Sequence, residues 1–383
     1  MMNKNKFVFW RSTAVLIGTI IGAGIFGLPY AFSKIGFIPG AVYLIVLATV
    51  LLIANFCYAE TILRTKDKLE MAGYVNRYLG KVGKIVISCS LILGNYAALT
   101  AYLIGAGGFL FFLLNPILGG SQIFWSLLFW ILASLLILRG SAALSRAELF
   151  MAIGLVACVA FISFLAYPHL SMSNILATDI GNLKDLFFPY GATLFALGGA
   201  SALPTMRKVL GDKIKLFKKS LFLGTLIPLI IYIIFCFIVL GVSGGSASEM
   251  ALEGMTKFVG KEIMLIGGCF GVLAISTSFL ALGYLLREVY HHDYNFSLFP
   301  AWFLAVSVPG ILFLIGLRSF ITVIGFTGGV LSGLQGIMLI ITYYQAKKKG
   351  DRIPEFKFSL PKPVAYFIYL IFVLGIVYQF LYV

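Results

Sequence analysis

Charged side chains are scarce in this sequence. Only 11% of its 383 residues are Asp, Glu, Lys or Arg, whereas 61% are hydrophobic, and the mean hydropathy is +1.02. A water-soluble globule of this length needs a far larger polar surface. The composition therefore excludes a soluble protein and indicates an integral membrane protein.

Residues that perform catalysis or bind metals are also sparse. The apolar stretches contain no cluster of His or Asp, no Ser–Lys pair and no metal-binding triad, one of which an enzyme acting inside the bilayer would need. Neither an enzyme nor an organic cofactor is therefore expected. There is no C-x-x-C motif, and we expect the five cysteines to be small packing residues in apolar stretches: Cys57, Cys89, Cys158, Cys236 and Cys269.

Long apolar stretches dominate what is present. A helix needs about 20 mostly apolar residues to cross a bilayer, and eleven stretches meet this length. The first has a basic leader, as a secretory signal has, but it is too long for one and ten more follow, so we expect it to be retained. The sequence thus predicts an all-α integral membrane protein with eleven transmembrane helices, at about residues 8–32, 39–63, 84–114, 122–138, 147–168, 186–206, 217–241, 261–287, 298–317, 319–345 and 363–382.

The basic residues lie mostly on one side of these stretches. If the N-terminus is cytoplasmic, 24 of the 29 Lys and Arg residues fall in loops on the cytoplasmic side and five on the other. The positive-inside rule then predicts a multi-pass protein of the cell membrane with a cytoplasmic N-terminus and an extracytoplasmic C-terminus. The net charge of +15 is explained by these basic loops on one side of the lipid bilayer, where they can contact anionic lipid. It therefore does not indicate a nucleic acid or an obligate protein partner.

Glycine interrupts two of the apolar stretches at matching places. Gly22 and Gly24 interrupt the first, Gly198 and Gly199 interrupt the sixth, and a proline follows each pair, five residues after Gly24 and Gly199. Each interrupted stretch opens a block of five, and an odd number of spans inverts the second block relative to the first. Interrupted helices at matching places in two inverted blocks are typical of secondary transporters with a substrate site at the midplane.

An unwound backbone in the membrane needs binding partners. Exposed N–H and C=O groups cost several kcal/mol each when unpaired, so such a break persists where it lines a cavity or binds a ligand. The half-helix that begins near Ala23 presents a partial positive charge to a carboxylate, and the carbonyl ends of the preceding half-helices suit an ammonium. A zwitterion fits both. The Gly18-x-x-x-Gly22 spacing also packs helices, so either break alone has a packing explanation.

A family resemblance rests on three strings. Gly18–Tyr30, GTIIGAGIFGLPY, resembles the first-helix signature of the amino acid-polyamine-organocation superfamily. Tyr58-Ala-Glu60 and Ala101-Tyr-Leu-Ile-Gly105 resemble the amino acid/auxin permease and aromatic amino acid permease group. The resemblance extends over nearly the whole chain. It implies alternating access and a LeuT-type fold of two inverted five-helix repeats, residues 1–168 and 184–346, with an extra helix at 363–383.

The resemblance also implies a substrate site at the two breaks. The amides of Ala23 and Gly24, beside Gly22, would hold a carboxylate, and the carbonyls of Ile20, Phe195 and Gly198 would hold the ammonium. Phe195 would also be an aromatic gate, four residues before Gly199, although ordinary packing explains a Phe equally. Small residues near the second break, among them Ser201, leave room for a medium or large side chain, and Tyr102 of the third stretch either lines this room or packs elsewhere.

Uphill transport needs a coupling ion, and the eighth stretch offers oxygens for sodium. Ala274, Thr277 and Ser278 stand at i, i+3 and i+4 on one helical face. Two hydroxyls and one carbonyl there, with the carbonyls of Gly18 and Ile21, resemble the sodium site between helices one and eight of sodium-coupled relatives. Hydroxyls that bond back to their own helix remain the alternative. Some proton-driven relatives place a Lys on the fifth helix, and none occurs here, which favours sodium.

Glu60 keeps a proton-coupled alternative open. It is the only carboxylate inside an apolar stretch, where burial favours its neutral form. Arg64 follows at i+4, however, and an ordinary ion pair on the last turn of the helix is the commoner explanation. No Asp, Glu, Lys or Arg lies in the midplane parts of stretches one, three, six, eight or ten, so a neutral substrate is expected. The sequence therefore predicts a sodium-driven symporter that imports neutral L-amino acids. A proton-coupled permease and a membrane amino acid sensor are the alternatives.

Overall fold

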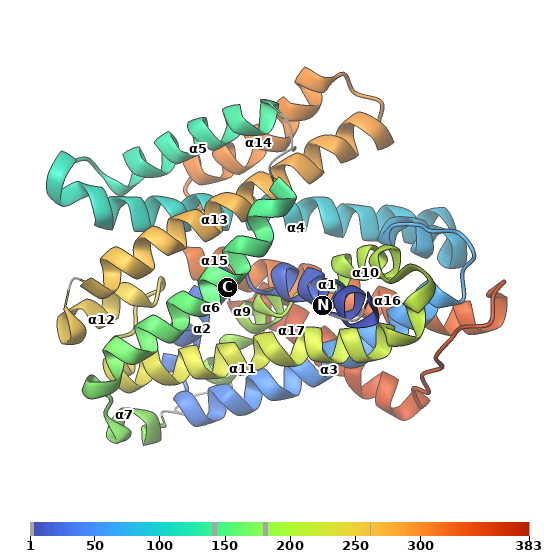
Figure 1. The fold of residues 1–383 in the computed structure, drawn as a ribbon, viewed down its shortest axis with the longest axis horizontal. Coiled ribbons are helices and arrows are strands. Elements are labelled where there is room, and N and C mark those ends of the chain that lie inside the picture. The colour runs from blue at the N-terminus through green and yellow to red at the C-terminus, as the bar shows by residue number, and fades with distance from the viewer. Residues whose placement is uncertain (1–3, 140–143, 179–182, 261, 383) are drawn as a thin grey trace.

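The computed structural model describes residues 4–139, 144–178, 183–260 and 262–382, and within these ranges the chain is helical, with a single isolated β-bridge and no longer strand. Figure 1 shows α5 and α14 together at one edge of the molecule, α3 and α11 together at the opposite edge, and α1, α2 and α9 between them. Large apolar side chains are exposed along the outer helices, as on α5 and α17, which is the surface expected of helices in lipid.

The helices occupy the positions that the apolar stretches predict. Their bounds are α1 Lys4–Ile20, α2 Gly24–Ser33, α3 Phe37–Leu63, α4 Met71–Leu118, α5 Gln122–Arg139, α6 Leu144–Ala166, α7 Met172–Leu176, α8 Leu183–Phe187, α9 Pro189–Ala196, α10 Leu203–Leu210, α11 Phe217–Ser243, α12 Leu252–Val259, α13 Glu262–Glu288, α14 Leu298–Leu314, α15 Phe320–Phe326, α16 Gly333–Lys349 and α17 Lys362–Tyr382. Short 3-10 helices include η2 Ala200–Ala202 and η3 Gly211–Leu216, and η6 Thr327–Ser332 is a π-helix between α15 and α16.

Fewer of these helices pass a simple test for membrane spans than the eleven expected. In the described part of the chain seven are long and apolar enough, or eight if the bent pair α1 and α2 forms one span. The difference has two sources. The run Asp185–Ser246 counts once although it contains the sixth and seventh stretches, and the helices Val156–His169 and Leu298–Leu314, in the fifth and ninth stretches, are shorter apolar helices.

The third stretch begins earlier than the sequence predicts. Helix α4 starts at Met71, not near residue 84, and has 48 residues. Gly80 lies inside it with a φ of 74°, a conformation that glycine adopts without strain. It therefore separates a short leading helix, which carries Arg77, from the long apolar helix that carries Tyr102.

The helices that carry the breaks form the centre of the packing. Helix α2 packs against α9 and α11, α1 packs against α10 and α11, and α13 packs against α4 and α6. Glycine and small side chains permit this close packing. The predicted substrate and sodium residues therefore lie on α1, α2, α4, α9, η2 and α13 and at the two breaks, around one central region (Figure 1), whereas Glu60 lies on α3.

Candidate functional site

The first break separates α1 from α2. Helix α1 ends at Ile20, α2 begins at Gly24, and their axes differ by 54°. Past the break the helix resumes with the amide of Phe26 donating to the carbonyl of Ala23 at 3.1 Å. Ala23 itself is 0% exposed, and its amide has no acceptor among the described residues. Because a buried amide without a partner is costly, this position suits a ligand oxygen.

The second break pairs more of its own backbone. Helix α9 ends at Ala196, and the amide of Gly198 turns back to the carbonyl of Phe195 at 3.2 Å, while the amide of Ala202 donates to Gly199 at 3.1 Å. Gly198 is exposed, and no donor to its carbonyl is found in the described part of the chain. The Gly198 carbonyl is therefore the accessible acceptor at this break.

The two breaks pack directly on each other. A Cβ atom on Gly24 would lie 2.7 Å from the Cα of Ala196 and 3.2 Å from a ring carbon of Phe195. A Cβ on Gly199 would lie 2.8 Å from side-chain atoms of both Ile20 and Leu16. Neither position has room for a side chain. The glycines thus allow the unwound segments of two distant parts of the sequence to meet.

Helices α4 and α13 reach the first break. A Cβ on Gly22 would lie 3.7 Å from the hydroxyl of Tyr102 and 4.0 Å from the hydroxyl of Ser278. Tyr102 is 8% exposed, so its ring is packed while its hydroxyl faces the break. The structure therefore brings together Gly22, Tyr102 and Ser278, which lie 80 to 256 residues apart in the sequence.

The predicted sodium ligands are only partly assembled. Thr277 donates its hydroxyl proton to the carbonyl of Ala274 at 2.9 Å, which is the back-bonding that hydroxyls in membrane helices commonly adopt. The hydroxyl oxygen of Thr277 and the carbonyl oxygen of Ala274 both retain a lone pair that can bind a cation. Ile21 is buried beside the break, whereas Gly18 is exposed and has no other atom within 4 Å of its Cβ position. Gly18 thus faces open space.

Burial differs between the two sides of the breaks. On the α2 side the ring of Phe26 packs edge-on against Phe109, with centroids 5.0 Å apart, and against Phe235, with centroids 6.2 Å apart. Gly18 on α1 and Gly198 and Ser201 at the second break are instead exposed. An aromatic cluster therefore covers α2 beyond the first break, whereas the exposed residues belong to α1 and the second break.

Tyr232 is a site residue that the sequence analysis missed. It lies on α11 with 0% exposure, and its hydroxyl approaches the carbonyl of Ile20 at 2.6 Å and that of Ala196 at 3.0 Å. The Ile20 carbonyl, expected to hold an ammonium, accepts this hydrogen bond. A single Tyr in an apolar stretch carries no pattern, so nothing in the sequence distinguishes it.

Glu60 forms an ion pair at the end of α3. Its side chain is fully buried, and one carboxylate oxygen lies 2.7 Å from Nε of Arg64. The other oxygen accepts a hydrogen bond from the amide of Phe358, in the segment between α16 and α17. Both oxygens are therefore engaged in holding this segment against α3.

Charged residues gather around the loop 64–70, and we call them the ionic network: Lys66, Asp67, Glu70, Arg77, Arg207, Lys208 and Asp351. Arg207 of α10 is 8% exposed, and its guanidinium donates to the carbonyls of Thr65 and Asp67 at 2.9 and 3.1 Å. Arg77 pairs with Asp67 and Asp351. The amide of Lys66 and the charge of Arg77 hold the pKa of Asp351 below its usual range.

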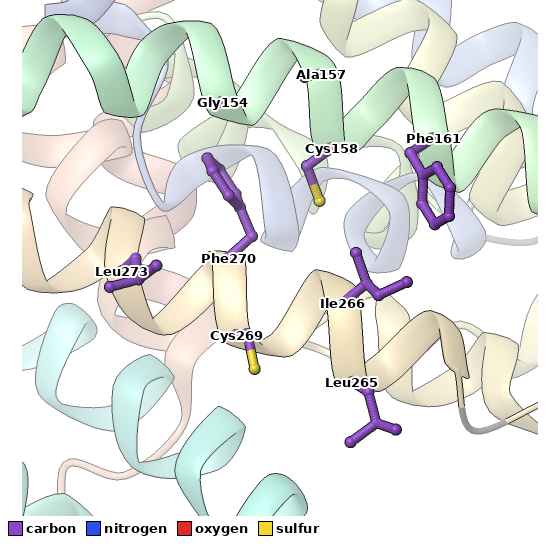
Figure 2. Close-up of a pocket in the computed structure, with 9 residues that line it drawn as sticks. All are labelled: Gly154, Ala157, Cys158, Phe161, Leu265, Ile266, Cys269, Phe270 and Leu273. Atoms are coloured by element: carbon purple, nitrogen blue, oxygen red, sulfur yellow. The ribbon is translucent and has the colours of Figure 1, made fainter.

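An apolar groove lies outside this central region, between α6 and α13. Figure 2 shows Cys158 of α6 pointing toward α13 and Phe270 of α13 pointing toward α6. Its exposed rim of Leu265, Ile266 and Leu273 suits lipid and offers nothing to bind a zwitterion. The cysteines are not all packing residues as expected, because Cys57 and Cys236 are buried but Cys89 and Cys269 are exposed.

Two interrupted helices that face each other inside an all-helical membrane protein define the class of secondary transporters. The chain belongs to the tryptophan/tyrosine permease family, whose sequence profile matches residues 4–381. This confirms the resemblance to amino acid permeases stated above. The relatives and the proteins of similar fold are transporters and not enzymes.

Individual relatives are distant but cover most of the chain. The tyrosine-specific transport system 1 of Haemophilus influenzae is 24% identical over 361 residues, covering 90% of this chain and 89% of that protein. The tryptophan-specific transport protein of Pseudomonas aeruginosa is 25% identical over 344 residues, covering 82% and 80%. The crystal structure of MhsT in complex with L-phenylalanine has a TM-score of 0.62 at 15% identity and covers 97% of both chains. This likeness gives the fold, which is of the LeuT type.

Proposed function

We propose that this protein is a sodium-coupled symporter that imports a neutral, aromatic L-amino acid by alternating access. The observation that carries the proposal is the pair of facing breaks, with the unpaired Ala23 amide on one and the open Gly198 carbonyl on the other. A carboxylate accepts from the amide, an ammonium donates to the carbonyl, and one α-amino acid supplies both.

The aromatic side chain is inferred from the surroundings of the breaks and from the relatives. Of the described residues, those whose side chains lie nearest to Gly22, Gly24 and Gly199 are uncharged, and they include the aromatic Tyr102 and Phe195. The ring of Phe26 follows two residues after Gly24 and packs against Phe109. A flat apolar side chain packs favourably against such rings. Relatives named for tyrosine and tryptophan transport support the same class.

The topology belongs to the proposal as well. We propose eleven spans in two inverted repeats plus α17, with the N-terminus in the cytoplasm. The loops that this topology assigns to the cytoplasm do touch, since Arg207 binds the loop 64–70 and Asp351 binds Lys66 and Arg77. The exposed α1 side of the site would then face the cytoplasm, so that the structure corresponds to an inward-facing state.

Sodium coupling rests on the oxygens of α13 and the first break. Ala274, Thr277 and Ser278 share one face of α13, and Ser278 lies close to Gly22. Sodium binding would require α1 to approach α13, because Gly18 now faces open space. Closure of this exposed side would therefore bring the remaining ligands in, which is how ion binding would favour one state over the other.

Uptake into proteoliposomes tests the coupling ion. We expect an inward sodium gradient to drive accumulation of labelled L-tyrosine, and a potassium gradient or a proton ionophore to have little effect. The double variant Thr277→Ala, Ser278→Ala should lose most of its sodium activation while still binding substrate. Ser276→Ala is the matched control, because Ser276 bonds back to Val272 and is not a predicted ligand.

Other results would redirect the proposal. The proton-coupled alternative would be established by three results together. Uptake would not depend on sodium, the ionophore would abolish it, and Glu60→Gln would remove its pH dependence. Substrate-dependent thermal stabilisation without any uptake would indicate a sensor. Full sodium activation in the double variant would exclude the α13 hydroxyls as ligands.

A further inference from the structure

We propose that Tyr232 is a positioning residue that joins the two breaks and directs the substrate's ammonium to the second one. Its hydroxyl lies between the last carbonyls of two half-helices, Ile20 of α1 and Ala196 of α9. Nothing in the family assignment points to this residue. The proposal rests on the contacts of α11 with both breaks.

The electrostatics of this arrangement favour a proton donor. The C-terminal end of a helix carries a partial negative charge, and here two such ends converge at one point. The hydroxyl has one proton for two carbonyls, so it donates to one of them at a time and stays near both. Without it, two carbonyls would face each other in a buried region with no donor, which is costly.

Burial alone does not produce this contact. Tyr58 and Tyr190 are also fully buried, and in both cases the hydroxyl has no hydrogen-bond partner among the described residues. Tyr232 differs because its hydroxyl reaches two backbone acceptors that lie 176 residues apart in the sequence. Its position on α11 therefore connects the first interrupted helix to the second.

This contact has a consequence for the substrate, and that part depends on the proposed function. The Ile20 carbonyl belongs to a buried residue and already approaches the Tyr232 hydroxyl, whereas the Gly198 carbonyl belongs to an exposed residue and has no donor in the described part of the chain. The Gly198 carbonyl is therefore the more accessible acceptor for an ammonium. Removing the hydroxyl would leave the Ile20 and Ala196 carbonyls as competing acceptors in a different place. The ammonium would then be drawn away from the position in which the carboxylate also reaches the Ala23 amide.

Hydrogen exchange of the substrate-free protein tests the link between the breaks. In Tyr232→Phe, which removes one oxygen atom, we expect faster exchange of the amides at 21–24 and 197–199 and little change elsewhere. Tyr190→Phe is the matched control, because it removes a buried hydroxyl that holds nothing. Unchanged exchange at both breaks in Tyr232→Phe would overturn the proposal, whatever the substrate is.

Ligand selectivity tests the role in positioning. We expect Tyr232→Phe to weaken binding of L-tyrosine about tenfold, equivalent to about 1.4 kcal/mol, and to weaken binding of 3-(4-hydroxyphenyl)propanoate, which lacks the amino group, by less than about threefold. Equal losses for both ligands would mean a structural role only and would overturn the positioning role. Failure of the wild-type protein to bind L-tyrosine would instead count against the proposed substrate. The hydrogen-exchange experiment would still test whether Tyr232 joins the two breaks.

Discussion

The two polar regions of this molecule are built in opposite ways. At the breaks the polar groups are backbone amides and carbonyls and neutral hydroxyls, such as those of Tyr102, Tyr232 and Ser278. In the ionic network around the loop 64–70, Arg207 and Arg77 are ionised and have several partners each. One region leaves backbone groups without partners, and the other satisfies its charges.

The difference follows from what each region has to do. A site that takes up and releases a zwitterion needs acceptors and donors that are free when it is empty, and it cannot hold an uncompensated charge in the bilayer. A junction between helices and loops needs fixed partners. Unpaired backbone groups at the breaks therefore indicate the binding region, and charged side chains with fixed hydrogen-bond partners indicate the structural one.

Filling the central space should have the largest effect. In Gly24→Val the new side chain would meet the backbone of Ala196, 2.7 Å from its Cβ position, and overpacking of this kind costs about 1–3 kcal/mol. Because the breaks would be forced apart, we expect substrate affinity to fall more than tenfold. The affinity is measured from the binding of labelled L-tyrosine to the purified protein.

Gly18→Ala is the control for this experiment. Gly18 lies in the same stretch, but its Cβ position has no other atom within 4 Å, so the added methyl group should leave affinity nearly unchanged. If both variants bind equally well, close approach of the two breaks does not form the site. If both fail to bind, loss at Gly24 reflects a general intolerance of α1 to substitution.

Much of the central region follows from sequence alone, because it depends on backbone. Glycine pairs at Gly22, Gly24, Gly198 and Gly199 mark where helices cannot continue, and their matching order predicts that they meet. The packing of Gly24 on Ala196 has this origin. Tyr232 was not predictable, since its role depends on which face of α11 turns toward the breaks, and that is decided by tertiary packing.

The ionic network was even less visible in the sequence. In the sequence Arg207 is one of six basic residues between positions 207 and 219, and only the fold places it beside the carbonyls of the loop 64–70. Glu60 was the exception, because Arg64 at i+4 already indicated the ion pair that the structure contains. An ion pair between residues four positions apart can be predicted from the sequence. A contact between residues about 140 positions apart, such as that of Arg207 with Thr65, can be seen only in the folded structure.

Breaking the network at its buried centre should destabilise the protein without abolishing binding. Arg207→Gln would remove the guanidinium that donates to the Thr65 carbonyl, and one of the two donors to the Asp67 carbonyl and to the Tyr74 hydroxyl. We therefore expect the free energy of unfolding to fall by about 2–3 kcal/mol. Lys208→Gln is the adjacent control. Its ion pair with Glu70 is largely exposed, and such pairs contribute at most about 1 kcal/mol. Thermal denaturation in detergent compares the two, and equal losses would contradict a special role for Arg207.

The smallest effect is expected at the exposed edge of the network, and it depends on pH. The Lys66 amide and Arg77 stabilise the ionised form of Asp351 and lower its pKa. A lowered pKa in the folded state contributes stability at a pH above the unfolded value of about 3.9, and this contribution is lost as the pH falls through the folded pKa. Asp351→Asn should therefore be slightly less stable than the wild type at pH 7. The difference should begin to shrink below about pH 4 and vanish once the pH is below the lowered pKa of Asp351 in the folded protein. Asp212→Asn, at an exposed carboxylate of η3, is the control. If Asp351→Asn remains less stable than the wild type in acid, hydrogen-bond geometry and not charge holds the segment after α16 to the loop 64–70.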